Sequence, residues 1–469
     1  MRVTNIRVEG LFGVFSHEIP LSETERVTII HGPNGFGKTV MLRMIAAVVE
    51  GTTSIFEETP FDEFSLTLSD GTTRIVRRRA EGKAGSAEPA VVLEYLIRDA
   101  AGSVVVVPQP APDSLPEVLY AQIDRLVPRP FTLRGKRWIN TETGREYSLA
   151  AILKIFPRAS QAIPKKDRPK PLFEMFEMSG DLEVFFVETN RLSSEVSEQH
   201  TIVGRDLYST AYGGQRAIFE DGSTRQIAPR VKQYSEDVVQ KIRSVLADYA
   251  KHSQENDRTF PERLVRFLRD GRALAERDIL SRMAELETKR RRLITLGLLD
   301  SEAGLRDLTE DDLHRAREAL TIYVGDVQAK LDVFDDLARR IGSLVDIIND
   351  RFNYKHLRID RQRGFRVFSD SNAPIRIEDL SSGEQHELVV LYELLFRAPK
   401  NGLILVDEPE ISLHVAWQSR FLADLIGILQ ITDAYAVVAT HSPVIIGPRN
   451  DLTVELKGPP SRARTREHA

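Results

Sequence analysis

The chain contains no cysteine and no long uninterrupted apolar stretch. Without cysteine, disulfide frameworks, zinc–thiolate sites and thiol catalysis are all excluded. No apolar run approaches the roughly 20 residues that a membrane-spanning helix needs. The first three residues start an expected strand and not a signal peptide. We therefore expect a cytoplasmic protein with no membrane partner, and its 42% of hydrophobic residues is ample for globular cores.

An excess of basic residues is also lacking, because the formal net charge is −5. This balance gives no global attraction to nucleic acid, so any DNA binding must come from local patches. Short basic runs occur at residues 77–79, 165–170 and 289–292. Such runs mostly form solvent-exposed surface. Contacts with DNA phosphates from a groove between two copies would nevertheless give salt-sensitive, sequence-independent DNA binding. Non-specific DNA therefore stays open as a partner.

A glycine-rich stretch near the start, GPNGFGKT at residues 32–39, fits the pattern G-x-x-x-x-G-K-[ST]. It follows an apolar run at 27–30, typical of a buried strand, and precedes an expected helix over 40–49. The glycines let backbone N–H groups turn toward phosphate oxygens, and the helix points its positive end at the same charge. Lys38 is expected to reach the β and γ phosphates and Thr39 to ligate Mg²⁺. We predict that ATP binds at Gly32, Pro33, Asn34, Gly35, Phe36, Gly37, Lys38, Thr39 and Val40.

A second cluster, LSSGEQ at residues 380–385, opens an apolar-periodic helix through Leu388, Leu391 and Leu395. Ser381 falls at its N-cap, where the hydroxyl and the exposed amides form a second anion site. A serine cap alone would be an ordinary helix start. An acidic pair that follows soon afterwards favours a phosphate-binding interpretation, with contacts from Ser381, Ser382, Gly383 and Glu384.

The acidic pair, Asp407 and Glu408, ends the apolar run 403–406. In parallel sheets, the side chains that bind ligands lie at the carboxyl ends of the central strands. Adjacent strand residues point to opposite sides, so we assign Asp407 to Mg²⁺ and Glu408 to a water molecule as general base. A further expected strand at 435–439 stops just before His441, whose imidazole would donate to the γ-phosphate and steady the attacking water. A lone histidine is more often an ordinary loop residue, but this one follows a strand and comes after the P-loop, the signature and the acidic pair in the chain.

Together, GPNGFGKT, LSSGEQ, LILVDEP at 403–409 and ATHS at 439–442 resemble the ABC-type ATPases of the SMC, RecF and OLD classes. The resemblance covers both ends of the chain. It implies an α/β ATPase head built from both ends, with ATP and Mg²⁺ as cofactors. It also implies ATP-dependent pairing of two heads, in which Ser381 and Gly383 of one copy close over the ATP of another. The stretch Glu410-Ile411-Ser412-Leu413-His414 matches the loop after the acidic pair, and Trp417-Gln418 follow it as in the OLD-like branch. This stretch is expected at the dimer face.

One departure from the family pattern concerns a glutamine that usually lies near Mg²⁺ at the end of an intervening strand. The expected strand at 184–187 ends instead in Glu188-Thr189-Asn190-Arg191. Glu188 or Asn190 is a candidate substitute. A plain pairing of Glu188 with Arg191 at the strand end is an equal alternative.

Between the two halves of the motif set lies a helical insert, which we place at residues 230–353. Thr309 to Asp312 predicts an acidic variant of the capping box. Behind it, apolar residues recur every seven positions: Leu313, Leu320, Val327, Phe334, Ile341 and Ile348. This seam predicts one helix of about 40 residues that folds back on an earlier helix ending near Gly297, as a short coiled-coil hairpin. An ordinary helical domain is the alternative.

The expected organisation has three parts. Residues 1–229 form the N-terminal part of the ATPase head with the P-loop, 230–353 the insert, and 354–469 the C-terminal part with the signature, acidic pair and His441. Strands and hairpins are expected over the first hundred or so residues. No function is assigned to residues 108–182.

The useful event in such a protein is the closing and opening of a dimer, since ATP binds well only to the closed state. The chain continues too briefly after His441 for the nuclease domain of the OLD class, so any effector is expected on a separate chain. The compact insert and the SLHxxWQ pattern resemble the stand-alone ATPases of bacterial antiphage systems such as PARIS and Septu. We therefore expect an ATP hydrolase, a homodimer or higher oligomer, that senses infection and controls a separate effector such as a nuclease.

A RecF- or SMC-like recombination or repair ATPase is the alternative function. A transporter ATPase is disfavoured by the large insert between the P-loop and the signature. A scaffold that binds ATP without turnover is disfavoured by Glu408.

Overall fold

The computed structural model describes residues 2–22, 24–50, 54–81, 90–107, 117–128, 130–135, 137–141, 146–147, 149, 152, 156, 159, 182–188, 224–300, 309–411 and 415–458. Several expected features lie outside these residues: the basic run 165–170, Asn190, Arg191 and residues 412–414. The chain divides into two compact units. The first unit comprises Met1–Thr189, Ala398–Ile411 and Gln418–Ala469, and the second comprises Asn190–Arg397 and Ser412–Trp417.

The first unit contains a five-stranded parallel sheet in the order β11-β15-β16-β3-β17. Its strands are β3 (Val27–His31), β11 (Val184–Glu188), β15 (Leu403–Asp407), β16 (Tyr435–Thr440) and β17 (Thr453–Glu455). The first four residues of β3 and of β15 are buried, as expected for strands covered on both faces. The strands expected from the apolar runs are confirmed, and they come from both ends of the chain.

The register of this sheet aligns the carboxyl ends of its strands. Asp407 at the end of β15 is paired with Ala439 of β16, and Thr440 is paired with His31 at the end of β3. Glu188 ends β11 beside Asp407. The chain segments that follow these strands therefore leave the sheet at one edge, where ligands bind in open α/β sheets.

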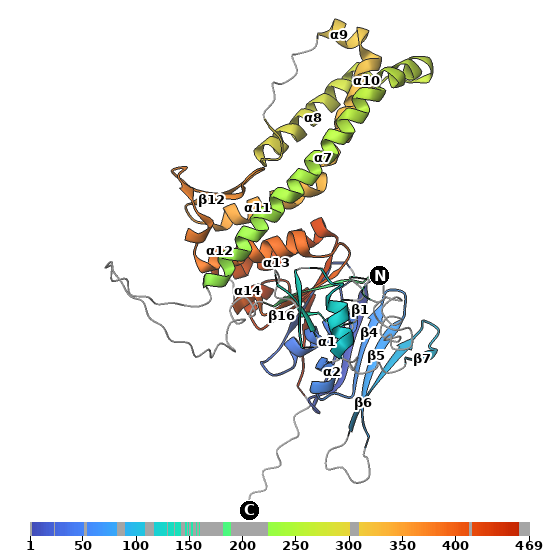
Figure 1. Cartoon of the computed structure of the whole chain (residues 1–469), viewed down its shortest axis with the longest axis vertical. Coiled ribbons are helices and arrows are strands. Elements are labelled where there is room, and N and C mark those ends of the chain that lie inside the picture. The colour runs from blue at the N-terminus through green and yellow to red at the C-terminus, as the bar shows by residue number, and fades with distance from the viewer. Residues whose placement is uncertain are drawn as a thin grey trace, which may run out of the picture. The chain divides into compact units, whose positions relative to one another are not determined.

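A six-stranded antiparallel sheet, in the order β2-β1-β4-β5-β6-β7, forms the rest of the main core of the first unit. Its strands are β1 (Val3–Leu11), β2 (Phe15–Pro20), β4 (Glu63–Leu68), β5 (Thr73–Glu81), β6 (Ala90–Arg98) and β7 (Val104–Val107). Helices α1 (Lys38–Glu50) and α2 (Ser54–Glu58) share one hydrophobic core with both sheets, to which α1 contributes Met41, Leu42 and Ile45. Figure 1 shows α1 and α2 beside the antiparallel strands. The expected α/β class is confirmed.

A small subdomain of the first unit contains a hairpin around Trp138. It consists of α3 (Glu117–Asp124), β8 (Phe131–Arg134), β9 (Arg137–Asn140) and β10 (Glu146–Tyr147). The fully buried Trp138 donates from Nε1 to Asp124 Oδ1 at 2.8 Å, which satisfies the polar atom of a buried ring. The first unit is completed by the short helices η4 (Pro409–Ile411), α14 (Pro443–Ile446) and η5 (Asn450–Leu452), and α13 (Val415–Thr432) falls mostly in it.

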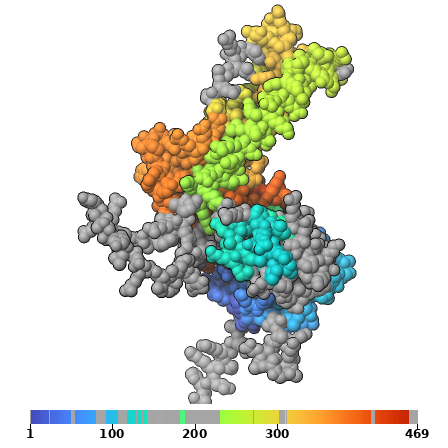
Figure 2. Space-filling model, viewed as in Figure 1, coloured from blue at the N-terminus to red at the C-terminus, as the bar shows by residue number. Residues whose placement is uncertain are grey.

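The second unit is mainly helical. Its helices are α7 (Thr224–Asp270), α8 (Glu276–Thr295), α9 (Glu310–Arg315), α10 (Arg317–Asp332), α11 (Asp335–Arg351), η2 (Ile377–Asp379), α12 (Ser382–Tyr392) and the π-helix η3 (Glu393–Arg397). A small sheet contains β12 (Lys355–Asp360), β13 (Gly364–Ser369) and β14 (Pro374–Ile375), and β12 and β13 form an antiparallel hairpin. Helix α10 lies against both α7 and α8 (Figure 1), and α7 forms the green strip of surface in Figure 2.

The heptad seam is interrupted, so the prediction of one continuous helix is wrong. Breaks at Ala316 and at Val333-Phe334 divide it into α9, α10 and α11. The backbone at the second break keeps near-helical angles, and the fully buried ring of Phe334 lies 5.5 Å from that of Tyr249 on α7. The apolar face therefore continues across the break while the helix restarts. The Thr309 capping box with Asp312 is confirmed.

Helix α7 is the element that the sequence pattern did not reveal. It spans 47 residues, and the seam packs on it as well as on α8, so a two-helix hairpin is incomplete. Within the described ranges, no helix is both long and apolar enough to cross a membrane.

Candidate functional site

The glycine-rich loop leaves β3 and enters α1 through two glycines in the left-handed region. Gly35 and Gly37 have φ of 88° and 87°, a conformation that costs other residues strain. A Cβ atom on Gly37 would also lie 2.4 Å from Leu11 Cδ2. The loop is thus shaped by its own backbone, and its amides precede the N-terminus of a 13-residue helix.

Lys38 is held inside this loop. Its ammonium donates to the carbonyl oxygens of Gly32 at 2.7 Å and Pro33 at 3.2 Å, and the residue is 5% exposed. Pro33, Asn34 and Gly35 at the top of the loop are exposed, whereas Phe36 and Val40 are half-buried. The charge of Lys38 is therefore concentrated under the exposed part of the loop.

The acidic strand end is brought to the same place. The Thr39 hydroxyl donates to Asp407 Oδ1 at 3.1 Å. A hydroxyl and a carboxylate oxygen side by side are the donors that Mg²⁺ uses in nucleotide sites, where it keeps most of its water and takes one or two protein ligands. In the described part of the chain, no group of three or more acidic or histidine side chains forms a metal cage. The pair Thr39 and Asp407 fits a cation that arrives with phosphates.

Glu408 has already left the strand, so strand alternation does not orient it as the sequence reasoning assumed. Its φ is 45°, in the left-handed region, and its N–H donates to the carbonyl of Ala439 at 2.8 Å. The α-helical region is disfavoured before Pro409, and the neighbouring strand holds the turn. Such backbone strain in a non-glycine residue occurs preferentially at functional sites. The Glu408 side chain is 23% exposed.

Two carboxylates lie near the same ring nitrogen of His441. Its Nδ1 is 3.8 Å from Glu408 Oε1 and 2.9 Å from Glu410 Oε1, and its side chain is 46% exposed. Glu410 was not among the expected site residues, although it follows Glu408 by two positions. An acidic residue so close to the expected base was the available signal. The structure thus brings Lys38, Thr39, Asp407, Glu408 and His441 to the carboxyl edge of one sheet, with Glu410 added.

The signature residues belong to the second unit. Ser381 is the N-cap of α12, followed by Ser382, Gly383 and Glu384 in its first turn, and it forms a complete capping box. Its hydroxyl accepts from the Glu384 N–H at 3.3 Å, and the Glu384 carboxylate accepts from the Ser381 N–H at 2.8 Å. The expected cap is confirmed.

Lys355 is a neighbour of the signature that sequence reasoning missed. Its ammonium donates to both oxygens of Glu384, at 2.9 and 2.8 Å. Burial acts to raise the pKa of the Glu384 carboxyl, but the hydrogen bonds from Lys355 and Ser381 hold it below its ordinary value. Glu384 is therefore an anion committed to the cap and to Lys355, and the exposed Ser381 and Ser382 remain at the helix start.

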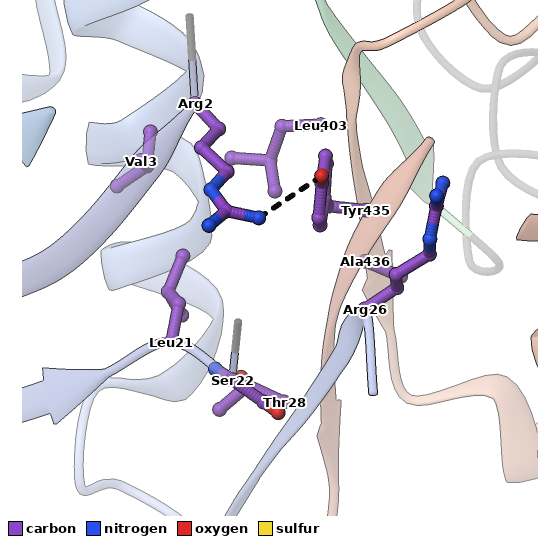
Figure 3. Close-up of a pocket in the computed structure, with 9 residues that line it drawn as sticks. All are labelled: Arg2, Val3, Leu21, Ser22, Arg26, Thr28, Leu403, Tyr435 and Ala436. Carbon is purple, nitrogen blue, oxygen red and sulfur yellow. Dashed lines mark hydrogen bonds between the residues drawn. The ribbon is translucent and has the colours of Figure 1, made fainter. Parts of the chain in front are cut away.

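A shallow pocket in the first unit is separate from this site. It lies at the amino ends of the parallel strands, where Leu403 and Tyr435 begin β15 and β16. Figure 3 shows Arg2 and Arg26 on opposite sides of the Tyr435 ring, and Arg2 donates to the Tyr435 hydroxyl at 3.1 Å. Both guanidinium groups lie within 5.4 Å of the tyrosine ring centroid. Because Arg2 precedes β1 and Tyr435 begins β16, the Arg2 contact links the antiparallel sheet to the parallel sheet.

A family model described as "AAA domain, putative AbiEii toxin, Type IV TA system" matches residues 154–447, more than half of the chain. The matched range contains the signature, the acidic pair and His441, whereas the glycine-rich loop lies before it. Protein ea59 of Escherichia phage lambda is 32% identical over 96 residues. That alignment covers 20% of this chain and only 18% of ea59.

Solved structures of SMC heads also align over most of the chain. The Smc head domain of Pyrococcus furiosus, bound to the C-terminal domain of ScpA, shows 13% identity and a TM-score of 0.31, with 95% of this chain and 90% of that chain covered. The SMC head domain of Thermotoga maritima shows 11% identity and a TM-score of 0.29, with 95% and 91% covered.

Proposed function

The chain belongs to the AAA-domain family described as putative AbiEii toxin of type IV toxin–antitoxin systems, and we propose from this premise that it binds and hydrolyses ATP. The observation that carries the proposal is the hydrogen bond of Thr39 to Asp407, which unites the glycine-rich loop with the acidic strand end. The same edge of the sheet then carries the phosphate-binding loop, the cation ligands Thr39 and Asp407, the base Glu408 and the imidazole of His441. This is the set that phosphoryl transfer to water requires.

In the proposed reaction, the amides of residues 32–40 and the Lys38 ammonium hold the phosphates. Mg²⁺ bound to Thr39 and Asp407 would neutralise phosphate charge. Glu408 accepts a proton from the attacking water, and His441 donates to the γ-phosphate. Glu188, whose backbone pairs beside Asp407, is our candidate for the position where related ATPases offer a glutamine.

We further propose that two copies share each ATP. Ser381 and Ser382 are exposed at the start of this helix, Gly383 beside them is half-buried, and the capping carboxylate of Glu384 is paired with Lys355. An N-terminus of this kind binds anions, and the γ-phosphate on the P-loop of a second copy is the anion we assign to it. ATP then acts as a ligand of the closed dimer alone, so binding and hydrolysis switch the assembly.

The biological output that we propose is control of a separate effector, such as a nuclease, in an antiphage defence system. The family description, which names toxin–antitoxin systems, supports this output over the alternative of DNA recombination or repair. Non-specific DNA binding belongs to the alternative.

The test is a pull-down of tagged full-length Glu408→Gln protein with ATP and Mg²⁺ from its native cells, with Lys38→Ala protein as the control that cannot close. A nuclease or toxin-like chain captured by Glu408→Gln and not by Lys38→Ala supports effector control. DNA with recombination proteins, and no such chain, would favour the repair function.

A further inference from the structure

We propose that Glu410 is a positioning residue for His441. It fixes the proton of the imidazole on Nδ1 and thereby assigns Nε2 to the γ-phosphate and the attacking water. The inference rests on the proposed ATP hydrolysis, but its central claim concerns one hydrogen bond that is measurable without turnover.

The first step is the geometry of the carboxylate. Glu410 Oε1 accepts from the His441 main-chain N–H at 2.8 Å and from the Thr440 hydroxyl at 2.8 Å, and it lies 2.9 Å from His441 Nδ1. Glu410 Oε1 thus contacts both the backbone and the ring of His441. The ring cannot rotate without breaking its contact with a side chain that is 8% exposed.

The second step is the proton. A carboxylate accepts hydrogen bonds and does not donate them, so the ring nitrogen facing it must carry the hydrogen. The imidazole is then a donor at Nδ1, and Nε2 is the nitrogen left for other partners. With Nδ1 protonated, Nε2 donates to the γ-phosphate only in the doubly protonated ring, with Glu410 as the counter-charge, and this is the form that the proposed reaction uses. Glu408 Oε1 is 3.8 Å from the same Nδ1, beyond hydrogen-bond length, so Glu410 and not Glu408 is the acceptor for this nitrogen.

The third step is the support of Glu410 itself. Its main-chain oxygen accepts from Gln418 Nε2 at 3.1 Å, and Gln418 Oε1 accepts from the Ser442 hydroxyl at 3.4 Å. Gln418 of α13 thereby holds both Glu410 and Ser442, the residue after His441, in place. Among the described residues, Glu410 Oε2 is buried and has no hydrogen-bond partner. Burial of a carboxylate oxygen without a partner destabilises a fold, so the favourable contacts of this carboxylate are those of Oε1.

The experiment measures the His441 ring directly in the full-length protein. Histidine labelled with ¹⁵N reports which ring nitrogen carries the proton, and the spectrum of His441→Asn identifies the His441 signals among the ten histidines. The variants are Glu410→Ala, which removes the acceptor, and Glu410→Gln, which keeps a neutral one. Thr440→Val is the matched control, because it removes the hydroxyl that donates to Glu410 and accepts from the Ser442 N–H, and leaves the contact of Glu410 with the ring.

Nδ1 should be protonated in the wild type, Thr440→Val and Glu410→Gln, and the proton should move to Nε2 in Glu410→Ala. In ATP hydrolysis, Glu410→Ala should lower kcat at least about 10-fold with little change in KM, and Glu410→Gln should recover part of the loss. An unchanged ring tautomer in Glu410→Ala would overturn the inference. A wild type without ATP turnover would instead overturn the proposed function, and the ring signals would still decide the role of Glu410.

Discussion

Thr39 and Asp407 are 368 residues apart in the chain, yet the hydroxyl of one donates to the carboxylate of the other at 3.1 Å. The contact follows from sheet topology. Residue 39 is in the first turn of the helix that follows β3, Asp407 ends β15, and both strands point the same way with only β16 between them. Parallel strands therefore bring the two ends of the chain to a common edge, and the site forms only when both are folded.

Lys38→Ala should abolish ATP binding, because the ammonium is the one side-chain charge that the loop holds under its exposed turn. Equilibrium binding of a fluorescent ATP analogue checks this. Lys400→Ala, an exposed lysine in the turn before β15, serves as the control and should bind normally. Ordinary affinity in Lys38→Ala would refute the assignment of the phosphate loop.

Glu408→Gln should bind ATP, accumulate as a closed oligomer and lose turnover by about 10²- to 10⁴-fold, the usual contribution of a general base. Phosphate release and size-exclusion chromatography with ATP and Mg²⁺ measure the two effects. Unchanged hydrolysis would remove Glu408 as the base.

Mixing Ser381→Arg with Lys38→Ala subunits tests whether sites are shared between copies. Each variant alone should be inactive, and the mixture should recover part of the wild-type rate, because one composite site in a mixed dimer has an intact P-loop and an intact signature. Absence of recovery at every mixing ratio would contradict a shared site.

Local patterns in the sequence predict much of this site. The P-loop, the buried strands at Val27 and Leu403, and the cap at Ser381 each depend on residues close together in the chain, and the structure confirms each element. Their roles in binding ATP stay predictions.

Contacts between distant segments were not predictable in this way. Glu410 meets His441 31 residues later, and Lys355 meets Glu384 29 residues later, through turns and packing that no local period encodes. Helix α7 was missed because it is polar on average and carries Pro261 in its interior, a residue that normally ends or kinks a helix. Its buried residues Val231 and Val238 are the helix-spaced signal that was available.

Removing Arg351 should destabilise the second unit strongly. Arg351 and Glu387 form an ion pair between α11 and α12, with side chains 3% and 1% exposed. Arg351→Met leaves a buried carboxylate unpaired, a cost of about 3–5 kcal/mol, whereas Arg351→Met combined with Glu387→Leu should restore most of the loss. Urea unfolding followed by circular dichroism measures both. Arg266→Ala, in an exposed pair with Glu262, should change the midpoint little. A double variant no more stable than Arg351→Met would refute this account.

His386 should make the protein less stable in mild acid. Burial in α12, with the Arg230 charge nearby, lowers the pKa of His386 from 6.5 to about 4. The His386 imidazole therefore binds a proton near pH 6.5 in the unfolded chain but only near pH 4 in the folded chain. The stability that neutral His386 allows is fully present above pH 6.5 and is lost as the pH falls through this window, by about 2 kcal/mol at pH 5. Urea unfolding at pH 7.5 and pH 5 should show a smaller difference for His386→Phe than for the wild type. His252→Gln, at an exposed position, should keep the wild-type difference, and an equal difference in His386→Phe would mean that this imidazole is charged in the folded protein.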